Sequence, residues 1–599
     1  MKPVEVEARA SLTCDPARLW PLLTDTERLN RATGNAPVAF EPLSDDSAAR
    51  FLGKTHLGGF DVQYEERPFE WSYLESFHVE RRMRSGPVEA VDVRFTLRQA
   101  GAGTEVTIRL AMTPRLFFLA PVLRYRATTA ARRIAREFER IDRALASDRP
   151  TALPAHPSLR RDALDRAARL LREGSPGEAA AKIVSLVELG EDVEVAKMRP
   201  FELADAWGLD RTETLDAFLR AVRAGLLELT WDVVCPSCRV ASSSLPSLSA
   251  LESHGSCQVC ELEFSVDLDD AVEATFTPAE GIRKVDRGPY CSGGPARTPH
   301  VLAQKIAPAH GRAALKAPPA VGAYRLFARG GHTASAEVST DGPAQASLAI
   351  GADGELTPRR VSVCPGGEIT LENGASREVH VKLERIEWAR KAATARAVTS
   401  LAAFRDQFAG DTLKPGLSLR VSRVAILFSD LVGSTQLYSD VGDGKAFRLV
   451  LDHFDLVGEI IARRRGTIVK TIGDAVMAVF ADELDAATAG IEIALAFRAF
   501  REGSPERRRT DIKLGVYSGA CYAVTANGIL DYFGQTVNVA ARLQAEAKSG
   551  EVVVEKRLAD ALRDRGAIPP GASLTEYDAH LKGLEAPLRA ARIEVMRST

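Results

Sequence analysis

Two acidic turns stand out near the end of this 599-residue chain: Phe428-Ser429-Asp430-Leu431-Val432-Gly433-Ser434-Thr435 and Lys470-Thr471-Ile472-Gly473-Asp474. Each turn carries a glycine and follows an apolar run that predicts a buried strand. Carboxylates can hold divalent cations, and glycines let backbone N–H groups approach phosphates. A third stretch, from Asp531 to Arg542, adds an asparagine and an arginine that can stabilise a charged transition state. The three stretches together predict a site for divalent cations and a phosphate-bearing substrate.

These stretches resemble the catalytic domain of the class III nucleotidyl cyclases, and the resemblance covers residues 421–596. It implies a ferredoxin-like α/β sandwich, which suits the expected order of a strand at 424–428, a helix at 445–464 and strands at 467–470 and 475–480. The implied activity is that of an adenylate cyclase, which converts ATP into 3′,5′-cyclic AMP and pyrophosphate. A guanylate cyclase and a degenerate domain that only binds ligands stay open as alternatives.

The resemblance also assigns roles to individual residues. Asp430 and Asp474 would ligate two Mg²⁺ or Mn²⁺ ions, with the backbone carbonyl of Leu431 as a further ligand. The residues expected to bind the triphosphate are Gly433, Ser434, Thr435 and Lys582, and those expected to orient the ribose and stabilise the transition state are Asn538 and Arg542. Many relatives carry one more basic residue shortly before Asp531, and the stretch 523–528 has none.

Substrate choice and assembly also follow from the resemblance. Lys470 and Asp531 match a purine-reading pair in which the lysine donates to adenine N1 and the aspartate accepts from the N6 amino group, so the pair favours ATP. In this family the metal acids and the purine-reading residues meet across a dimer interface. Because one chain carries all of these residues, a homodimer with shared sites suffices.

Four cysteines form a second candidate metal site. Cys235 and Cys238 make one Cys-x-x-Cys pair, and Cys257 and Cys260 make another after 18 intervening residues. Four thiolates at this spacing predict one closed, structural Zn²⁺ site in a zinc ribbon over residues 231–268. A redox role and a ligand role for His254 are the weaker alternatives. The isolated cysteines are expected to be packing residues, and these are Cys14, Cys291, Cys364 and Cys521.

The N-terminal part predicts a separate domain. Residues 4–12 alternate as a half-buried strand, Asp15 and Pro16 open a short helix, and antiparallel strands and a long helix follow. This order resembles the START-like helix-grip fold over residues 1–147. The resemblance implies a cavity for an apolar small molecule that regulates the enzyme, while a helix and sheet that pack closed is an equal alternative.

The middle of the chain predicts three further units. Residues 158–230 resemble a winged helix, although the acids Glu213 and Asp216 beside its arginines argue against DNA binding and favour a structural role. Recurrent short strands between Gly-bearing turns predict a small β-sandwich within 269–387. Residues 388–410 are expected to form one helical linker that carries a signal to the catalytic domain. The whole chain is therefore expected to be multidomain α+β.

Composition excludes several partners and compartments. The 78 Lys and Arg residues balance 80 Asp and Glu residues, so we expect no nucleic-acid partner. The longest apolar run, residues 116–123, is far shorter than the roughly 20 residues that span a bilayer, so we expect no membrane partner. The N-terminus lacks an apolar signal sequence. We therefore expect a cytoplasmic protein.

Overall fold

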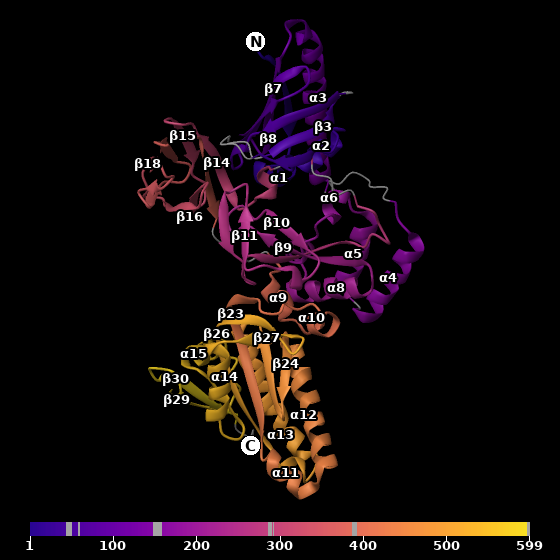
Figure 1. Ribbon diagram of the computed structural model, residues 1–599, viewed down its shortest axis with the longest axis vertical. Helices are drawn as coiled ribbons and strands as arrows, with labels where there is room; N and C mark the ends of the chain where they lie inside the picture. The colour runs from indigo at the N-terminus through magenta and orange to yellow at the C-terminus, as the bar shows by residue number, and fades with distance from the viewer. Residues whose placement is uncertain are drawn as a thin grey trace.

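The chain forms an elongated molecule, with its N-terminal domain at one end and its C-terminal domain at the other (Figure 1). The structure is a computed structural model, and it describes residues 1–43, 51–57, 60–147, 158–175, 177–285, 290–291, 293–385 and 392–595. The stretch 147–157 carries three prolines and no apolar period, which predicts a linker, and it lies almost entirely outside the described residues. Among the described helices, none combines the length and the apolar character needed to cross a bilayer.

The N-terminal domain is an antiparallel sheet with a long helix packed along it. Asp15 caps the first helix by accepting from the backbone N–H groups of Ala17 and Arg18, which confirms the predicted helix start. The elements are β1 (Val4–Leu12), α1 (Pro16–Leu23), α2 (Thr26–Ala32), β2 (Ala39–Pro42), β3 (Phe51–Leu57), β4 (Phe60–Glu66), β5 (Glu70–Ser72), β6 (Ser76–Met83), β7 (Val88–Ala100), β8 (Gly103–Pro114) and α3 (Ala120–Ala146).

Aromatic side chains fill the space between this sheet and its helices. Phe77 stacks on Phe95 with ring centroids 4.2 Å apart, and Phe95 also contacts Phe138 of α3. Trp20 of α1 meets Phe77 edge to face. This packing favours the closed alternative for the N-terminal domain, and the apolar ligand stays a prediction.

The middle region begins with a group of helices that pack on a three-stranded sheet, ordered β10-β9-β13. The two helices and the following strand expected from the resemblance to a winged helix are present as α7, α8 and β9. The elements are α4 (Arg161–Gly174), α5 (Glu178–Leu189), α6 (Asp192–Val195), α7 (Pro200–Trp207), α8 (Arg211–Arg223), β9 (Leu227–Val234), β10 (Ala241–Leu245), β11 (His254–Cys257), β12 (Leu262–Ser265) and β13 (Val272–Pro278).

The β-sandwich differs from its prediction in two ways. Strand β13, placed by the prediction within the sandwich, pairs with β9 of the middle region instead. One sandwich layer also continues the N-terminal sheet, because β14 pairs with β5. The sandwich strands are β14 (Val301–Ala307), β15 (Arg312–Lys316), β16 (Gly322–Ala328), β17 (His332–Val338), β18 (Gln345–Ile350), β19 (Leu356–Thr357), β20 (Arg360–Val363), β21 (Glu368–Asn373) and β22 (Val379–Arg385).

The partner of β13 could not be identified from the sequence of this strand. Residues 272–277 alternate apolar and polar side chains, a pattern that predicts a strand but not the strand with which it pairs. All residues of β13 are buried, and its partner β9 precedes both cysteine pairs in the chain.

The single helix expected at 388–410 is wrong over its described part. Residues 392–410 form two short helices instead, α9 (Ala395–Thr399) and α10 (Ala402–Gln407). The backbone at Thr394 forms a β-bridge with Glu273, and Leu401 between the helices is extended. Both helices bury apolar side chains against the rest of the chain, so neither is a free linker helix.

The C-terminal domain is a sheet ordered β24-β25-β23-β26-β28-β30-β29, covered by helices on both faces (Figure 1). Side chains of β23 alternate between the two faces: Leu427 joins the core under α12 and α13, while Ile426 joins the core that includes α14. The elements are β23 (Ser418–Val432), α11 (Ser434–Val441), α12 (Asp443–Arg463), β24 (Gly466–Ile472), β25 (Ala475–Phe480), α13 (Glu483–Glu502), β26 (Asp511–Ala526), β27 (Ile529–Phe533), α14 (Gln535–Glu546), β28 (Glu551–Glu555), α15 (Lys556–Asp564), β29 (Ser573–Ala579) and β30 (Leu588–Glu594).

A continuous apolar core joins the middle region to this domain. It runs from Phe218 of α8 through Phe404 of α10 to Phe428 and Tyr532 in the C-terminal sheet. The middle region therefore packs directly on the strands that carry the candidate site.

Candidate functional site

The two predicted metal acids lie at the same end of neighbouring strands. Asp430 is near the end of β23, and Asp474 lies in the turn that joins β24 to β25. The register pairs Ser429 with Val476, so the two strands bring both acids to one edge. Both carboxylates therefore lie at one end of two adjacent strands.

Each acid has an oxygen suited to a cation. The Asp430 carboxylate accepts from the Lys513 ammonium at 3.0 Å and from the Gln544 amide at 3.4 Å. One carboxylate oxygen of Asp474 is buried without a hydrogen-bond partner among the described residues. A buried, unpaired carboxylate oxygen is costly unless a cation or a donor compensates it. The hard oxygen donors of this edge therefore fit a divalent cation such as Mg²⁺ or Mn²⁺.

A glycine turn follows Asp430 and opens α11. Gly433 has a φ of +85°, and a Cβ at this position would lie 2.9 Å from the carbonyl oxygen of Arg509. Only glycine fits both constraints. Ser434 is the first helical residue, and Leu431 packs into the core with its backbone in the strand. Thr435 is the second residue of α11, and the structure does not describe its side chain.

The predicted purine-reading residues contact each other. The Lys470 ammonium donates to the Asp531 carboxylate at 2.6 Å, although these residues lie on β24 and β27. Asp531 is 3% exposed, and its other oxygen accepts from the backbone N–H of Tyr532. The Lys470 ammonium also lies 5.4 Å from the centre of the Phe533 ring. A base could meet this pair beside an aromatic ring.

Helix α14 carries the next two predicted residues on its outer side. Asn538 and Arg542 are one turn apart, while Val539 and Leu543 of the same helix are buried. Gly583 lies beside the Arg542 guanidinium, since a Cβ there would be 3.2 Å from one of its nitrogens. Lys582 is exposed next to Gly583, so the structure brings the predicted triphosphate lysine near the predicted transition-state arginine.

The acids and the purine-reading pair form two groups within one chain. Among the described residues, no hydrogen bond or ion pair joins Asp430 or Asp474 to Lys470, Asp531, Asn538 or Arg542. Sequence reasoning missed Lys513 and Gln544, the two described contacts of Asp430. The pairing of β23 with β26 brings Lys513 to Asp430, and the packing of α14 brings Gln544 to it. No local sequence motif indicates either contact.

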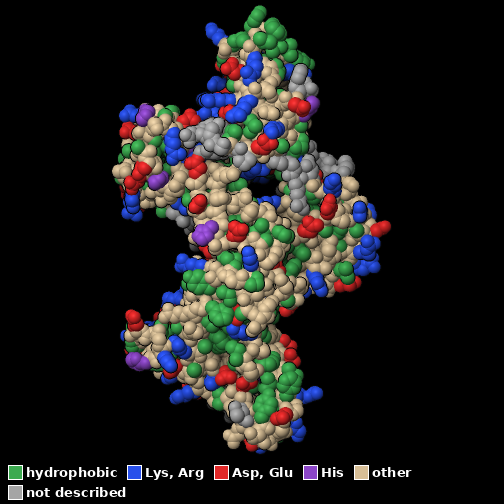
Figure 2. Space-filling view, in the orientation of Figure 1, with side chains coloured by type: hydrophobic (Ala, Val, Ile, Leu, Met, Phe, Trp, Pro, Cys, Tyr) green, Lys and Arg blue, Asp and Glu red, His purple; other side chains and the backbone are tan. Residues whose placement is uncertain are grey.

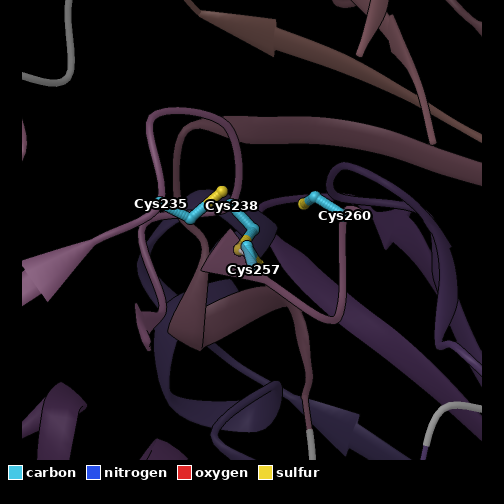
Figure 3. A group of neighbouring side chains, drawn as sticks. All are labelled: Cys235, Cys238, Cys257 and Cys260. Carbon is cyan, nitrogen blue, oxygen red and sulfur yellow. Dashed lines mark hydrogen bonds between the residues drawn. The ribbon is translucent and has the colours of Figure 1, made fainter. Parts of the chain in front are cut away.

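The four predicted zinc-ligating cysteines lie together in a separate place. Cys235 and Cys238 follow β9, whereas Cys257 ends β11 and Cys260 lies in the turn after it, and Figure 3 shows the two loops converging. Their sulfur atoms all lie within 4.8 Å of one another, and all four residues are buried. A tetrahedral zinc site with Zn–S bonds of about 2.3 Å separates its sulfurs by about 3.8 Å. The cluster therefore fits one Zn²⁺ ion.

A strand of the β-sandwich seals this cluster. Lys382 of β22 is buried, and its ammonium lies 3.2 Å from the sulfur of Cys260. Glu384 lies two residues after Lys382 on the same strand. Its carboxylate accepts a hydrogen bond from the Ser237 hydroxyl at 3.0 Å and forms an ion pair with the Arg325 guanidinium at 2.6 Å. The cysteine loops are thus tied to the sandwich by buried charges, and Lys382 is a further residue that sequence reasoning missed.

Comparison with protein families identifies the C-terminal domain. Residues 418–582 match the family described as adenylate and guanylate cyclase catalytic domain. The C-terminal part of the chain is therefore a nucleotide cyclase domain, with the mixed α/β fold of that class. Residues 162–289 match a family of unknown function (DUF5939), which covers most of the middle region.

Curated relatives match about a quarter of the chain. An adenylate cyclase of Streptomyces coelicolor is 34% identical over 143 residues, which are 23% of this chain and 34% of that protein. An uncharacterized protein of Mycobacterium tuberculosis is 32% identical over 165 residues, 27% of this chain and 39% of that protein. A receptor-type guanylate cyclase of Caenorhabditis elegans is 28% identical over 158 residues, 24% of this chain and 15% of that protein. The chain thus spans well under half the length of each of these relatives, and the relatives carry both substrate names.

Two solved structures align with part of the chain. The adenylyl cyclase CyaB from P. aeruginosa aligns with 30% of this chain and 98% of its own, at 21% identity and a TM-score of 0.26. An adenylate/guanylate cyclase/hydrolase from Silicibacter pomeroyi aligns with 30% of this chain and 100% of its own, at 28% identity and a TM-score of 0.27.

Proposed function

We propose that this protein is an adenylate cyclase, which converts ATP into 3′,5′-cyclic AMP and pyrophosphate. The observation that carries the choice of ATP is the contact between Lys470 and Asp531 in the cyclase domain. The lysine can donate to the N1 acceptor of adenine, and the aspartate can accept from the N6 amino group. Guanine presents a donor at N1 and an acceptor at O6, so each contact would meet the wrong partner.

The reaction joins the ribose 3′-oxygen to the α-phosphorus while the bond to the β-phosphate oxygen breaks. Pyrophosphate leaves, and the proton of the 3′-hydroxyl is released. Two divalent cations held by Asp430, Asp474 and the carbonyl of Leu431 would activate the hydroxyl and neutralise phosphate charge. Lys513 would give up its contact with Asp430 when such a cation binds.

The remaining residues hold the substrate. The N–H groups of Gly433, Ser434 and Thr435 lie at the start of α11, where the helix dipole favours phosphate oxygens. Arg542 stays charged and can donate more than one hydrogen bond to the pentacovalent phosphate. Asn538 would orient the ribose, and Lys582 would bind the triphosphate beside Arg542.

We propose a homodimer, since the acids and the purine-reading pair make no described contact within one chain. A two-fold pair would build two equal sites, each taking the acids from one protomer and the purine-reading residues from the other. Mixing Asp474→Ala protein with Lys470→Ala protein tests this. One working site per mixed dimer would restore activity that neither variant has alone, and no recovery would contradict shared sites.

The N-terminal two thirds would regulate the cyclase through α9 and α10. The guanidinium of Arg405 donates to the carbonyl oxygen of Leu530 at 2.7 Å, directly beside Asp531. Arg405 also lies over the ring of Tyr532, on the other side of Asp531. A shift of α10 would therefore move the strand that carries the purine-reading aspartate. Arg405→Gln should change the KM for ATP several-fold, whereas Arg359→Gln on the exposed sandwich surface should not.

Purified full-length protein should be incubated with ATP and with GTP, each with Mg²⁺ or Mn²⁺, and both cyclic nucleotides quantified. Cyclic AMP from ATP alone supports the proposal. Cyclic GMP in excess would favour the guanylate cyclase, and no product under any condition would favour a degenerate domain. We further propose that Cys235, Cys238, Cys257 and Cys260 bind one structural Zn²⁺ ion, and that the enzyme acts in the cytoplasm.

A further inference from the structure

An exposed apolar patch caps the end of the molecule that lies farthest from the cyclase domain (Figures 1 and 2). It is formed where β8 ends and α3 begins. Phe117 is 79% exposed, Tyr125 73% and Phe118 60%. Leu116 and Val122 are each at least half exposed and complete the patch, which we call the tip.

The tip is not a loose end of the fold. On α3, Leu123, Ala127 and Ala131 face the sheet and are buried, so the helix is already anchored through its inner side. The tip side chains are exposed, and Phe117 contacts Phe118 edge to face with centroids 5.8 Å apart. Large aromatic residues gathered on an anchored, exposed surface mark a binding surface rather than a core.

Arginines lie within and beside this apolar patch. Residues 115–126 contain three arginines and no acid. No ion pair among the described residues engages Arg124 or Arg126, which flank Tyr125 and are exposed. Lys2 lies at the same end, because β1 begins opposite the end of β8. Two acids, Glu5 and Glu89, lie on the strands β1 and β7 near this end, and the cations outnumber them.

We propose that the tip docks this protein on the surface of an anionic lipid bilayer. Aromatic side chains prefer the interface between headgroups and acyl chains, and arginines beside them attract anionic headgroups. Insertion would reach only the headgroup boundary, as for other interfacial anchors. This inference goes beyond the proposed cyclase activity, and it replaces the expectation of no membrane partner that the short apolar run suggested.

Charge favours a membrane over a second copy of the chain. Two tips packed face to face would bring the arginines of both copies together, and like charges across an interface are destabilising. An anionic bilayer suits both the apolar side chains and the arginines of the tip, because its apolar interior lies beneath negatively charged headgroups.

Co-sedimentation of the full-length protein with vesicles tests the proposal. The vesicles would contain phosphatidylcholine alone or about three parts phosphatidylcholine to one part phosphatidylglycerol. We expect binding to the anionic vesicles only, weakened as NaCl rises well above about 0.1 M. Phe117→Ser with Phe118→Ser should lower the binding constant at least about tenfold. Arg124→Gln with Arg126→Gln should lower it about fivefold per arginine and flatten the salt dependence.

Matched controls make the result decisive. Leu170→Ser with Leu189→Ser removes two other exposed apolar residues and should bind like the unaltered protein. Thermal melting of every variant reports whether each is folded. Absence of sedimentation by the unaltered protein, or equal binding by the phenylalanine variant, would overturn the proposal. A change of oligomeric state in that variant, with vesicle binding unchanged, would assign the tip to contact between copies instead.

Discussion

The two candidate metal sites of this chain differ in burial, and the difference separates a stabilising role from a chemical one. The four cysteines are buried and sealed by Lys382 of another sheet. The acids Asp430 and Asp474 lie at a strand edge, where Asp474 is half-buried and one of its oxygens has no partner among the residues that the structure describes. Four protein ligands complete the coordination of a metal ion and leave no position for a substrate. An incomplete set of ligands leaves such a position open. Removing the cysteine site should therefore lower the stability of the protein, and removing the acid site should lower its turnover.

The largest expected effect is on turnover at the acid site. Asp474→Ala should lower the kcat for cyclic nucleotide formation by at least about 10³-fold, because a cation that stabilises the transition state contributes several kcal/mol. Its melting temperature should hardly change, since the lost carboxylate oxygen has no described partner. Product quantification and thermal melting measure both. Asp455→Ala, which alters an exposed acid on α12, is the control that should keep full activity.

The cysteine site should show the opposite pattern. Cys257→Ser should remove zinc from the purified protein and lower the melting transition of the middle region on the order of 10 °C, because structural zinc contributes folding free energy. Metal analysis and calorimetry measure this. Cys364→Ser changes a half-buried cysteine outside the cluster and should keep one zinc per chain. Unaltered protein with far less than one zinc per chain would contradict the assignment.

A buried histidine should make the cyclase domain sensitive to acid. Burial lowers the pKa of His453 to about 4, below its ordinary value near 6.5. The folded state therefore favours the neutral ring, so stability is full above about pH 6.5 and falls as the pH drops toward 4, by up to about 3 kcal/mol. Denaturant unfolding at pH 7 and pH 5 measures the slope. His453→Leu should reduce it, and exposed His580→Leu should leave it unchanged.

The smallest expected effect sharpens the contrast at the sealed site. Lys382→Met removes the charge beside Cys260 while keeping most of the side-chain volume. It should weaken zinc retention against a competing chelator about 10- to 100-fold, the usual cost of losing a residue that supports metal ligands. Lys316→Met, at an exposed lysine of the same sandwich, is the control. Equal zinc retention by both variants would show that Lys382 does not support the cluster.

The candidate sites were largely predictable because their chemistry lies in short motifs. The acids of 428–435 and 470–474 sit where strands end, and each Cys-x-x-Cys pair spans a single turn, so local sequence brings the ligand atoms of each motif close together. Lys513 and Lys382 could not be found in this way. Each reaches its site through strand pairing or sheet packing with residues far away in the chain.

Domain boundaries were less predictable for the same reason. Turn signals mark where strands end but not which strands pair, so the pairing of β5 with β14 and of β9 with β13 stayed hidden. The single helix expected at 388–410 was wrong because apolar spacing shows only which side chains could share one face of a helix. It does not show contacts with distant residues that hold the backbone in another conformation. The bridge between Thr394 and Glu273 holds the backbone before α9 in a strand-like conformation instead.

The sequence by itself determined the cyclase domain and pointed to its candidate metal acids and to the four clustered cysteines, because these rest on residue types at short, regular spacing. Only the tertiary structure decided that the N-terminal and sandwich sheets are continuous, that α10 packs beside Asp531, and that Phe117 and Phe118 stand in solvent. Pairing and burial depend on the free energy of the whole packed chain, and an apolar run of the same composition could equally have become core.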